Sequence, residues 1–293
     1  MSLPIKAYPL PEAAADRQLP SGASLMARSV CQLARPCLTQ PLHTPRFVFH
    51  EASLLQVLGG RLDLDAGIDG SIDRLSVDDT ASLLLVEPNT CVDLMKTPDG
   101  PERPFRSVFM ALPSDLLDAF YRAHPEKMNT NVTTNTTAPF HQIPFDDDLA
   151  ATWLHVCNSA ASAQVSDTRL HYRLMDLLTA LAERGHRFRQ TGPRGTAGRL
   201  RTLIGETPAR HWTAHEAGSA LAMSEATLRR RLAGEATRFE DVLIDTRMHH
   251  AMMLLQTTPL SIPRIALACG YQSRARFSER FRARFGYLPS SVR

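Results

Sequence analysis

The chain has 293 residues, of which 43% are hydrophobic, so it can bury a core of ordinary size and is expected to form two domains. Its five cysteines are odd in number and contain no C-x-x-C pair, which argues against a disulfide framework and against a zinc site. The sequence has no apolar run of the ~20 residues that span a bilayer and no apolar signal-peptide core, so we expect a cytoplasmic protein without membrane contacts.

The net charge of +3 hides a difference between the two ends of the chain. From Gly198 onward there are 15 arginines, no lysine and eight acidic residues, whereas the preceding part carries a small net negative charge. We therefore expect the C-terminal part to bind a polyanion.

Residues 1–20 are rich in proline and alanine without periodicity, which predicts a mobile arm, either without function or covering another part of the protein. In residues 21–145, short apolar runs alternate with turn residues such as Gly59-Gly60. The predicted strands are residues 46–49, 53–58, 61–64, 82–86, 91–95 and 106–112. Short strands at even spacing predict a sandwich or a jelly-roll barrel.

Metal-dependent barrels of this kind use an H-x-H pair with a nearby glutamate, and His43 and His50 are too far apart in sequence to form such a pair. We therefore expect no metal, no cofactor and no catalytic site in this domain. A barrel of about eight strands can still enclose a small molecule.

The segment that follows is predicted to be helical, apart from a polar connecting loop at residues 129–137. A short helix is expected at residues 112–121, before that loop, and two longer helices at 146–163 and 166–187. The last of these carries leucines at spacings that form an apolar seam, Leu170, Leu174, Leu177, Leu178 and Leu181. Such a seam packs either on its own domain or on a second copy. Residues 190–198, QTGPRGTAG, have the composition of a linker, which places the last domain at residues 199–293.

Two helix pairs follow within this last domain. In the first pair, Thr213 and Glu216 form a predicted capping box, and a turn leads to a helix with Leu228 inward and three arginines at its middle. In the second pair, Gly270 makes the turn, and the following helix carries three inward phenylalanines and five arginines. A basic helix alone can be a solvated face, but a tight turn between two helices, the second of them basic, is typical of a helix-turn-helix unit.

A single predicted helix at residues 239–256 joins the two units, and its length of roughly 27 Å is near the ~34 Å of one DNA turn. In such units, side chains near the start of the second helix reach base edges. The expected base-reading residues are Ala226, Arg229, Arg230, Arg274, Ala275 and Glu279. The expected phosphate contacts are Arg276, Ser278 and Arg282.

These residues resemble the AraC/XylS family of transcription regulators. The matching motif positions are Ile262, Ile265, Ala266, Gly270, Tyr271, Ser273, Phe277, Arg280, Phe281, Arg282, Phe285, Gly286, Pro289 and Arg293, with Ser224, Leu228, Gly234, Phe239, Arg247, Ala251, Leu254 and Leu255 upstream. Departures from the family pattern occur at Arg264, Leu288 and Val292.

The resemblance implies an α+β protein in which an N-terminal cupin-like β-barrel sensor domain precedes an all-α domain with two helix-turn-helix units. It implies a sequence-specific transcriptional regulator, most often an activator, that binds promoter DNA and RNA polymerase and responds to a small molecule or a protein effector. It also favours a homodimer formed by the helices of residues 146–189, with Leu170, Leu174, Leu177 and Leu181 as the seam.

Two other function classes remain open at this point. An architectural DNA-binding protein without sequence preference would not need two readers with different side chains. An enzyme fused to a DNA-binding tail, as in alkylation-repair relatives, would need a four-cysteine zinc cluster and a reactive-cysteine signature, and the sequence has neither.

Overall fold

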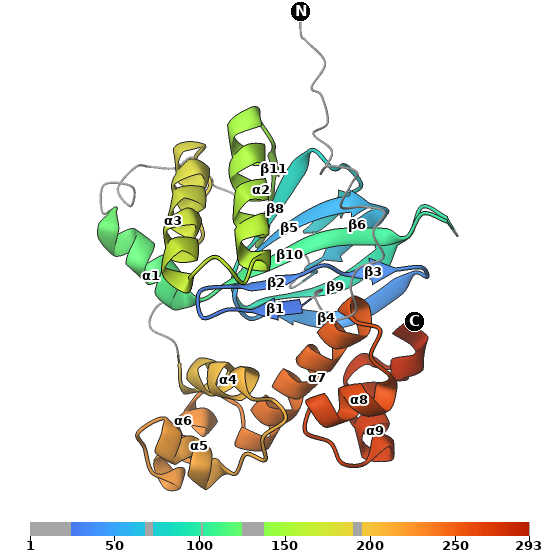
Figure 1. The fold of residues 1–293 in the computed structure, drawn as a ribbon. Helices are drawn as coiled ribbons and strands as arrows, with labels where there is room; N and C mark the ends of the chain where they lie inside the picture. Colours follow the sequence, from blue (N-terminus) through green and yellow to red (C-terminus); the bar gives the residue numbers. More distant parts are fainter. Residues whose placement is uncertain (1–24, 68–72, 101, 125–137, 190–194, 293) are drawn as a thin grey trace, which may run out of the picture. The chain divides into compact units, whose positions relative to one another are not determined.

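Sheets and covering helices make up the N-terminal part of the chain, and the C-terminal part is helical (Figure 1). The computed structural model describes residues 25–67, 73–100, 102–124, 138–189 and 195–292. It divides into residues 1–190, the N-terminal unit, and residues 191–293, the C-terminal unit, and each is described by itself. The α+β class is confirmed. The predicted arm and the predicted loop at residues 129–137 lie outside the described residues.

Two antiparallel sheets form the N-terminal unit. The larger has the strand order β1-β2-β10-β5-β8-β11, with β3 also pairing with β10, and the smaller has the order β4-β9-β6-β7. The strands are β1 (Leu25–Ala27), β2 (Gln32–Ala34), β3 (Cys37–Leu38), β4 (Leu42–Phe49), β5 (Ala52–Gly59), β6 (Arg61–Asp65), β7 (Arg74–Val77), β8 (Ser82–Val86), β9 (Thr90–Thr97), β10 (Phe105–Leu112) and β11 (Phe140–Pro144). Within the described ranges no pairing joins the two sheets, so they form a sandwich and the expected barrel is not closed.

All six predicted strands lie within observed strands, and their burial follows from their place in the sandwich. Strand β8, SLLLV, is buried along its whole length because the other sheet covers one face and helices cover the opposite face. Strand β9 instead alternates, with Val92, Leu94 and Lys96 buried and Asp93 and Met95 exposed. Strands β1, β2, β3, β7 and β11 were not predicted from the sequence.

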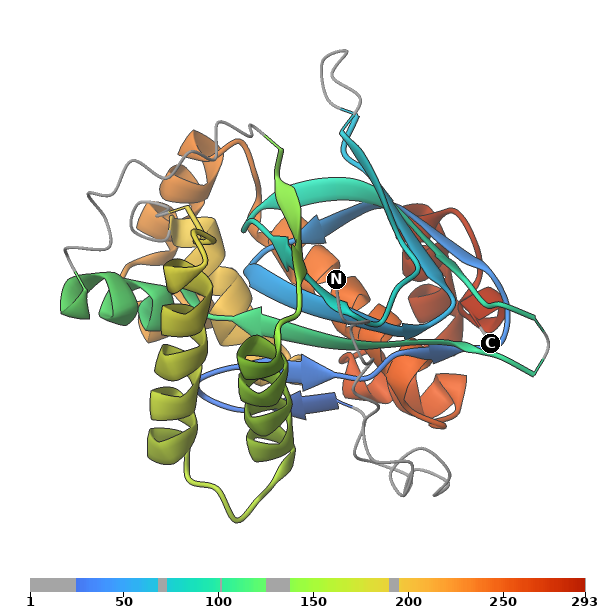
Figure 2. The ribbon, with the colours of Figure 1, turned by 90° about the horizontal axis from the view of Figure 1, so that it is seen from above.

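Three helices cover the outer face of the larger sheet, namely α1 (Ser114–Ala123), α2 (Asp147–Ala161) and α3 (Asp167–Glu183). Figures 1 and 2 show α2 and α3 side by side along this face. Helix α3 ends before the predicted residue 187 because Gly185 takes the left-handed conformation, with φ of +80°.

The leucine seam of α3 packs inside its own unit. Leu170, Leu174, Leu177 and Leu181 are at most 1% exposed within a single chain and share one core with α1, α2 and the larger sheet. These leucines are therefore not available as a dimer contact. The observed packing is the alternative that the spacing left open, because a seam shows that one helix face is apolar but not what covers it.

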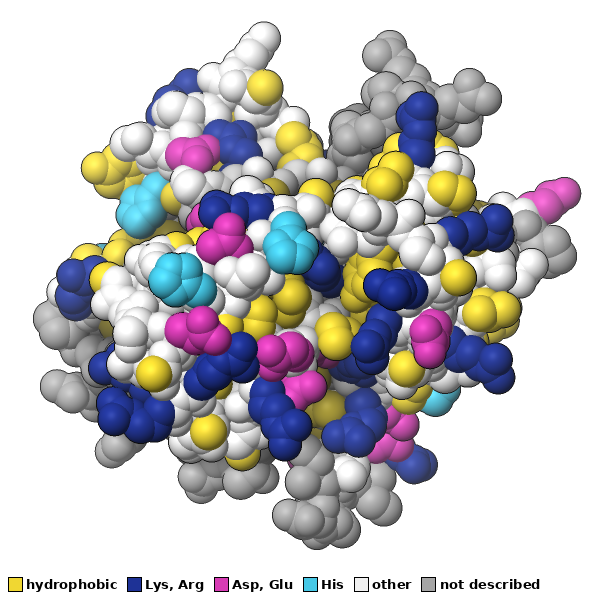
Figure 3. Space-filling model, turned by 90° about the horizontal axis from the view of Figure 1, so that it is seen from below, with side chains coloured by type: hydrophobic (Ala, Val, Ile, Leu, Met, Phe, Trp, Pro, Cys, Tyr) yellow, Lys and Arg dark blue, Asp and Glu magenta, His cyan; other side chains and the backbone are white. Residues whose placement is uncertain are grey.

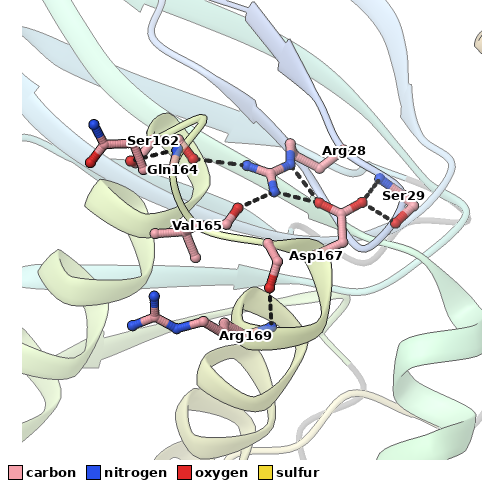
Figure 4. Close-up of polar contacts among 8 residues, drawn as sticks. Arg28, Ser29, Ser162, Gln164, Val165, Asp167 and Arg169 are labelled. Carbon is pink, nitrogen blue, oxygen red and sulfur yellow. Dashed lines mark hydrogen bonds and ion pairs between the residues drawn. The ribbon is translucent and has the colours of Figure 1, made fainter.

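Polar contacts fix the loops around this helical layer. In Figure 4, Arg28 and Ser29 from the turn after β1 point toward the carboxylate of Asp167, at the start of α3. Arg28 also donates to the Ser162 and Val165 carbonyls of the α2–α3 loop, at 3.1 and 2.6 Å. The hairpin β1–β2 is thus tied to the connection between the two helices.

The C-terminal unit contains α4 (Thr196–Glu206), α5 (Ala214–Ala220), α6 (Glu225–Gly234), α7 (Phe239–Thr257), α8 (Ile262–Ala268), α9 (Arg274–Phe285) and the 3-10 helix η3 (Pro289–Val292). Helices α4, α5, α6 and the start of α7 share one core. Helix α4 was not predicted, and it begins inside the range expected to be a linker, of which residues 190–194 lie outside the described part. The Glu235 carboxylate accepts hydrogen bonds from the Thr196 and Ala197 amides, at 2.6 and 2.9 Å, and so caps this helix.

Candidate nucleic-acid interface

The first helix pair, α5 and α6, is built by local capping. The Glu216 amide donates to Thr213 Oγ1 at 3.1 Å, and the Thr213 amide donates back to the Glu216 carboxylate at 2.9 Å, which confirms the predicted capping box. Gly218 is buried where the two helices meet, and a Cβ on it would lie 2.9 Å from the Met223 carbonyl oxygen. The close approach of α5 to the turn therefore requires glycine here.

The second pair, α8 and α9, turns at Gly270, whose φ of +77° favours glycine. Phe277, Phe281 and Phe285 are at most 1% exposed, so they anchor α9 inward as predicted. The N-cap Ser273 accepts a hydrogen bond from the Arg276 amide at 3.3 Å, as Ser224 does from the Thr227 amide at 3.2 Å in α6. Residues in the second helix of each pair can therefore be numbered from equivalent serine N-caps.

Counting from the two N-caps makes the helices α6 and α9 directly comparable, because Leu228 and Leu232 occupy the positions of Phe277 and Phe281 and all four are fully buried. The outward face of α6 is the first stripe, and that of α9 is the second stripe. The first stripe consists of Ala226, Arg229, Arg230 and Ala233, and the second of Ala275, Ser278, Glu279 and Arg282.

Five of the six expected base-reading residues lie on these stripes, together with two of the three expected phosphate contacts. The sixth, Arg274, is exposed in the first turn of α9, beside its stripe, at the position that Glu225 occupies in α6. Arg276 is exposed on the flank of α9. The spacing of each stripe, at steps of three and four residues, gives a single face that can lie against a groove.

Cationic side chains gather around these stripes. Figure 3 shows arginines across the visible face of the C-terminal unit, with acidic side chains between them. The exposed arginines of the two reading helices and their flanks are Arg229, Arg230, Arg231, Arg274, Arg276, Arg280 and Arg282. This face can neutralise several phosphates at once.

Arg229 differs from its neighbours because two carboxylates hold it. Its Nε donates to Glu225 Oε1 at 2.9 Å, and its Nη1 donates to Glu240 Oε1, on the first turn of α7, at 3.3 Å. The hydrogen bond to Glu225, followed by that to Glu240, raises the pKa of the Arg229 guanidinium. Arg229 was among the residues predicted from the sequence, whereas neither acid was.

Helix α7 carries the contacts that join the two helix pairs. Arg247, at its middle, donates to the Pro208 carbonyl at 3.1 Å and to the Arg210 carbonyl at 2.8 Å, both in the segment before α5. Its guanidinium also lies over the ring of Tyr271, just after the turn of the second pair, at 5.6 Å. One side chain therefore connects the segment that leads into the first pair with the turn of the second pair, a role that the spacing of α7 residues did not indicate.

Asp245, two residues earlier on α7, accepts a hydrogen bond from Arg284 of α9 at 2.8 Å. The helix thus has polar contacts to both sides in addition to its apolar core. With 19 residues it spans roughly 28 Å, close to the predicted length.

A buried lysine stands out in the N-terminal unit. Lys96 lies on the inward face of β9, is 7% exposed, and has Leu42 and Leu62 as its cross-strand neighbours. Its Nζ lies 5.8 Å from the centre of the Phe105 ring, on the opposite sheet. Burial lowers the pKa of Lys96 to about 7. Lys96 was not predicted as a functional residue, although a lysine at an inward position of an alternating strand is a signal that the sequence contains.

The two histidines considered for metal binding do not form a pair. His43 is exposed on the outer face of β4, with Nε2 3.9 Å from a carboxylate oxygen of Asp93, and His50 lies just beyond the end of that strand. None of the helices in the described ranges is both long and apolar enough to cross a bilayer.

Known proteins resemble the C-terminal unit in sequence. A family model described as a helix-turn-helix domain matches residues 217–293. The HTH-type transcriptional regulator YdeO of Escherichia coli strain K12 is 35% identical over 101 residues, which are 34% of this chain and 40% of YdeO. The regulator GadX of the same strain is 35% identical over 92 residues, 31% of this chain and 34% of GadX. The chain thus matches less than half the length of these curated relatives.

A resemblance in structure extends over both units. ToxT from Vibrio cholerae, in its apo form, superposes with a TM-score of 0.59 and 12% identity over 91% of this chain and 97% of ToxT. ToxT with a bound unsaturated fatty acid superposes with a TM-score of 0.55 and 11% identity over 90% of this chain and 95% of ToxT. At this level of identity the likeness shows a shared two-domain fold.

Proposed function

We propose that this chain, whose C-terminal unit is a helix-turn-helix domain of the AraC/XylS type, is a sequence-specific DNA-binding transcriptional regulator. The observation that carries the proposal is the pair of outward stripes on α6 and α9, which are joined by one continuous helix, α7, whose length of roughly 28 Å is near the ~34 Å of one DNA turn. Its curated relatives are named as transcriptional regulators.

The side chains of the stripes favour sequence preference over architectural binding. Arginine can bond guanine O6 and N7 in a bidentate manner, and Glu279 can accept a hydrogen bond from cytosine N4. The alanines leave room for a thymine methyl group. A protein that bound DNA by charge alone would have no use for an acidic side chain on its DNA-facing stripe, because Glu279 repels phosphate.

Selection of bound sequences from random DNA by the full-length chain, followed by titration of the selected site and of random DNA at one salt concentration, tests the proposal. A sequence-specific regulator should bind the selected site at least about a thousandfold more tightly than random DNA. Equal binding of both would leave the architectural alternative.

We extend the proposal to an effector bound between the two sheets of the N-terminal unit, an acid with an apolar chain. One of the ToxT structures holds an unsaturated fatty acid, and here the buried Lys96 lies beside the apolar side chains of Leu42, Leu62 and Phe105. A carboxylate close to Lys96 would favour its charged form and offset the cost of burial.

Thermal unfolding of the full-length chain with and without oleate tests the effector proposal. A ligand at a hundredfold its Kd stabilises the folded protein by about 2.7 kcal/mol. Lys96→Met should abolish the stabilisation, whereas Arg61→Met, which removes a cation from the outer face of the neighbouring strand β6, should retain it. Equal stabilisation of both variants would contradict the role of Lys96.

Contact with RNA polymerase, activation and homodimerisation remain proposals, as does action in the cytoplasm, where promoter DNA would be reached. If a dimer forms, it must use a surface other than the four buried leucines of α3. Tyr172, on the outer face of the same helix, is 69% exposed and is the natural place to test by substitution with arginine.

A further inference from the structure

Two acids, Glu225 and Glu240, accept hydrogen bonds from Arg229 of the first stripe. Glu225 and Arg229 lie one turn apart on α6, and Glu240 belongs to another helix, so the guanidinium is fixed from two directions. The three side chains keep between 41% and 57% of their surface exposed. The cluster therefore lies at the surface and not in the core.

The hydrogen-bond geometry leaves part of the guanidinium available. A guanidinium has five N–H donors. In Arg229, the Nε hydrogen and one Nη1 hydrogen are used by the two carboxylates, so the second Nη1 hydrogen and both Nη2 hydrogens have no acceptor among the described residues. A bidentate bond to guanine O6 and N7 needs two N–H donors, and three remain on Arg229.

The cluster occurs in the first helix pair and not in the second. At the matching positions of the second helix pair, Arg274 stands in place of Glu225 and Ser278 in place of Arg229, so neither the acid nor the arginine is repeated. If a helix pair needed such a cluster for its stability, both pairs would be expected to contain one. The difference indicates a task that belongs to the sequence read by α6.

We propose that Glu225 and Glu240 are positioning residues for base recognition, holding Arg229 so that its remaining N–H donors meet one guanine of the site. The inference rests on the proposed function, that α6 reads bases in the major groove. Fixing a long side chain in its bound conformation lowers the entropy lost on binding, and this gain applies only where the guanine is present.

An acid near a DNA-binding face also has a simpler effect, which weakens the affinity for DNA. A solvated carboxylate repels phosphates, so its neutralisation should strengthen binding to every DNA sequence by a similar factor. A positioning carboxylate should instead support the preference for the selected site over random DNA. The ratio of the two affinities separates these roles, because it is insensitive to charge that acts on all sequences alike.

The experiment compares Glu240→Gln with Asp241→Asn in the full-length chain. Asp241 is an exposed acid on the same first turn of α7, so the control removes an equal charge at nearly the same place. We expect Glu240→Gln to lower the ratio of selected-site to random-DNA affinity about fivefold or more, the lower range for one bidentate base contact, and Asp241→Asn to leave it unchanged. Equal ratios in the two variants would overturn the proposal.

A double-mutant cycle with Arg229→Ala supplies the second measurement. If Glu240 acts through Arg229, Glu240→Gln should change the ratio about fivefold in the wild-type background and not at all in the Arg229→Ala background. Equal effects of Glu240→Gln in both backgrounds would overturn the proposal. All these variants alter exposed side chains, and circular dichroism will show whether they fold.

Failure of the proposed function has a different signature. If the wild-type chain binds selected and random DNA equally, no variant can change the ratio, and the proposed regulator itself is refuted. If the wild type shows a preference that Glu240→Gln leaves intact, only the positioning role is refuted.

Discussion

Arg247→Met is the substitution that should most directly weaken the connection between the two helix pairs. Methionine keeps much of the aliphatic length of arginine but removes the donors to the Pro208 and Arg210 carbonyls and the guanidinium over the Tyr271 ring. The helix α7 itself should persist, because methionine is a good helix former. The change therefore tests the connection between the pairs.

The expected loss follows from these contacts. A hydrogen bond with a charged partner contributes about 1.5–3 kcal/mol when buried, and a cation–π contact at an exposed site about 0.5–1 kcal/mol. Because Arg247 is only half buried, we take the lower values and expect the free energy of unfolding of the C-terminal unit to fall by about 2–4 kcal/mol.

Urea denaturation followed by fluorescence measures this loss in the full-length chain. The sequence has two tryptophans, Trp153 in the N-terminal unit and Trp212 in the C-terminal unit, so a Trp153→Phe background leaves Trp212 as the reporter. Trp212 is buried and donates to the Thr207 carbonyl at 3.3 Å, close to the residues that Arg247 contacts.

The matched control is Arg238→Met, which removes an exposed arginine at the start of the same helix. We expect this control to change the unfolding free energy by less than about 0.5 kcal/mol. If Arg247→Met were no more destabilising than Arg238→Met, the two pairs would not depend on this side chain and the reasoning would be refuted.

Four other outcomes can be measured. Arg230→Ala should cost about 1–3 kcal/mol on the selected site and less on random DNA, whereas Arg282→Ala should weaken both equally; equal losses for Arg230→Ala would refute base reading. The pKa of Asp146 is lowered to about 2 by its hydrogen bond from Arg184, so this pair stabilises the fold above pH ~3.9 and ceases to do so as the pH falls through 2. Unfolding midpoints of wild type and Asp146→Asn should therefore differ at pH 5 and converge near pH 2, and a constant difference would refute the assignment. Leu174→Ala should destabilise the N-terminal unit by about 3–5 kcal/mol without changing the oligomeric state. If this substitution dissociated a dimer, the leucine seam of α3 would have to lie in the dimer interface. The C-terminal unit expressed alone should fold and bind DNA with a slope of log K against log salt of about −5, and a fragment without helical circular dichroism would contradict this.

The tandem helix pairs could be predicted from the sequence because their signals are local. Thr213 and Glu216 are three residues apart, and each reading helix has a serine N-cap followed by inward residues four and eight positions later. Such patterns specify structure within one or two turns. The relative positions of the side chains on α6 and α9 followed from helical spacing alone.

The features that sequence analysis missed depend on residues brought together from separate elements. Helix α4 begins in a segment with glycine and proline, and its cap is Glu235, 39 residues away in sequence. The pair Glu225–Arg229 has helical spacing, but Glu240 joins it only because the chain turns between α6 and α7. The missed strands β1, β2, β3 and β7 are only two to four residues long.

The difference between the two stripes gives the binding site a direction. The first stripe presents two arginines where the second presents a serine and a glutamate, so the two halves of the bound site differ and one chain should bind the site in a single orientation. A single protomer would then lie on a promoter with α6 always toward the same end of the bound site. Reversing the selected site ahead of a reporter gene should therefore change transcription even though the bound sequence and its affinity stay the same.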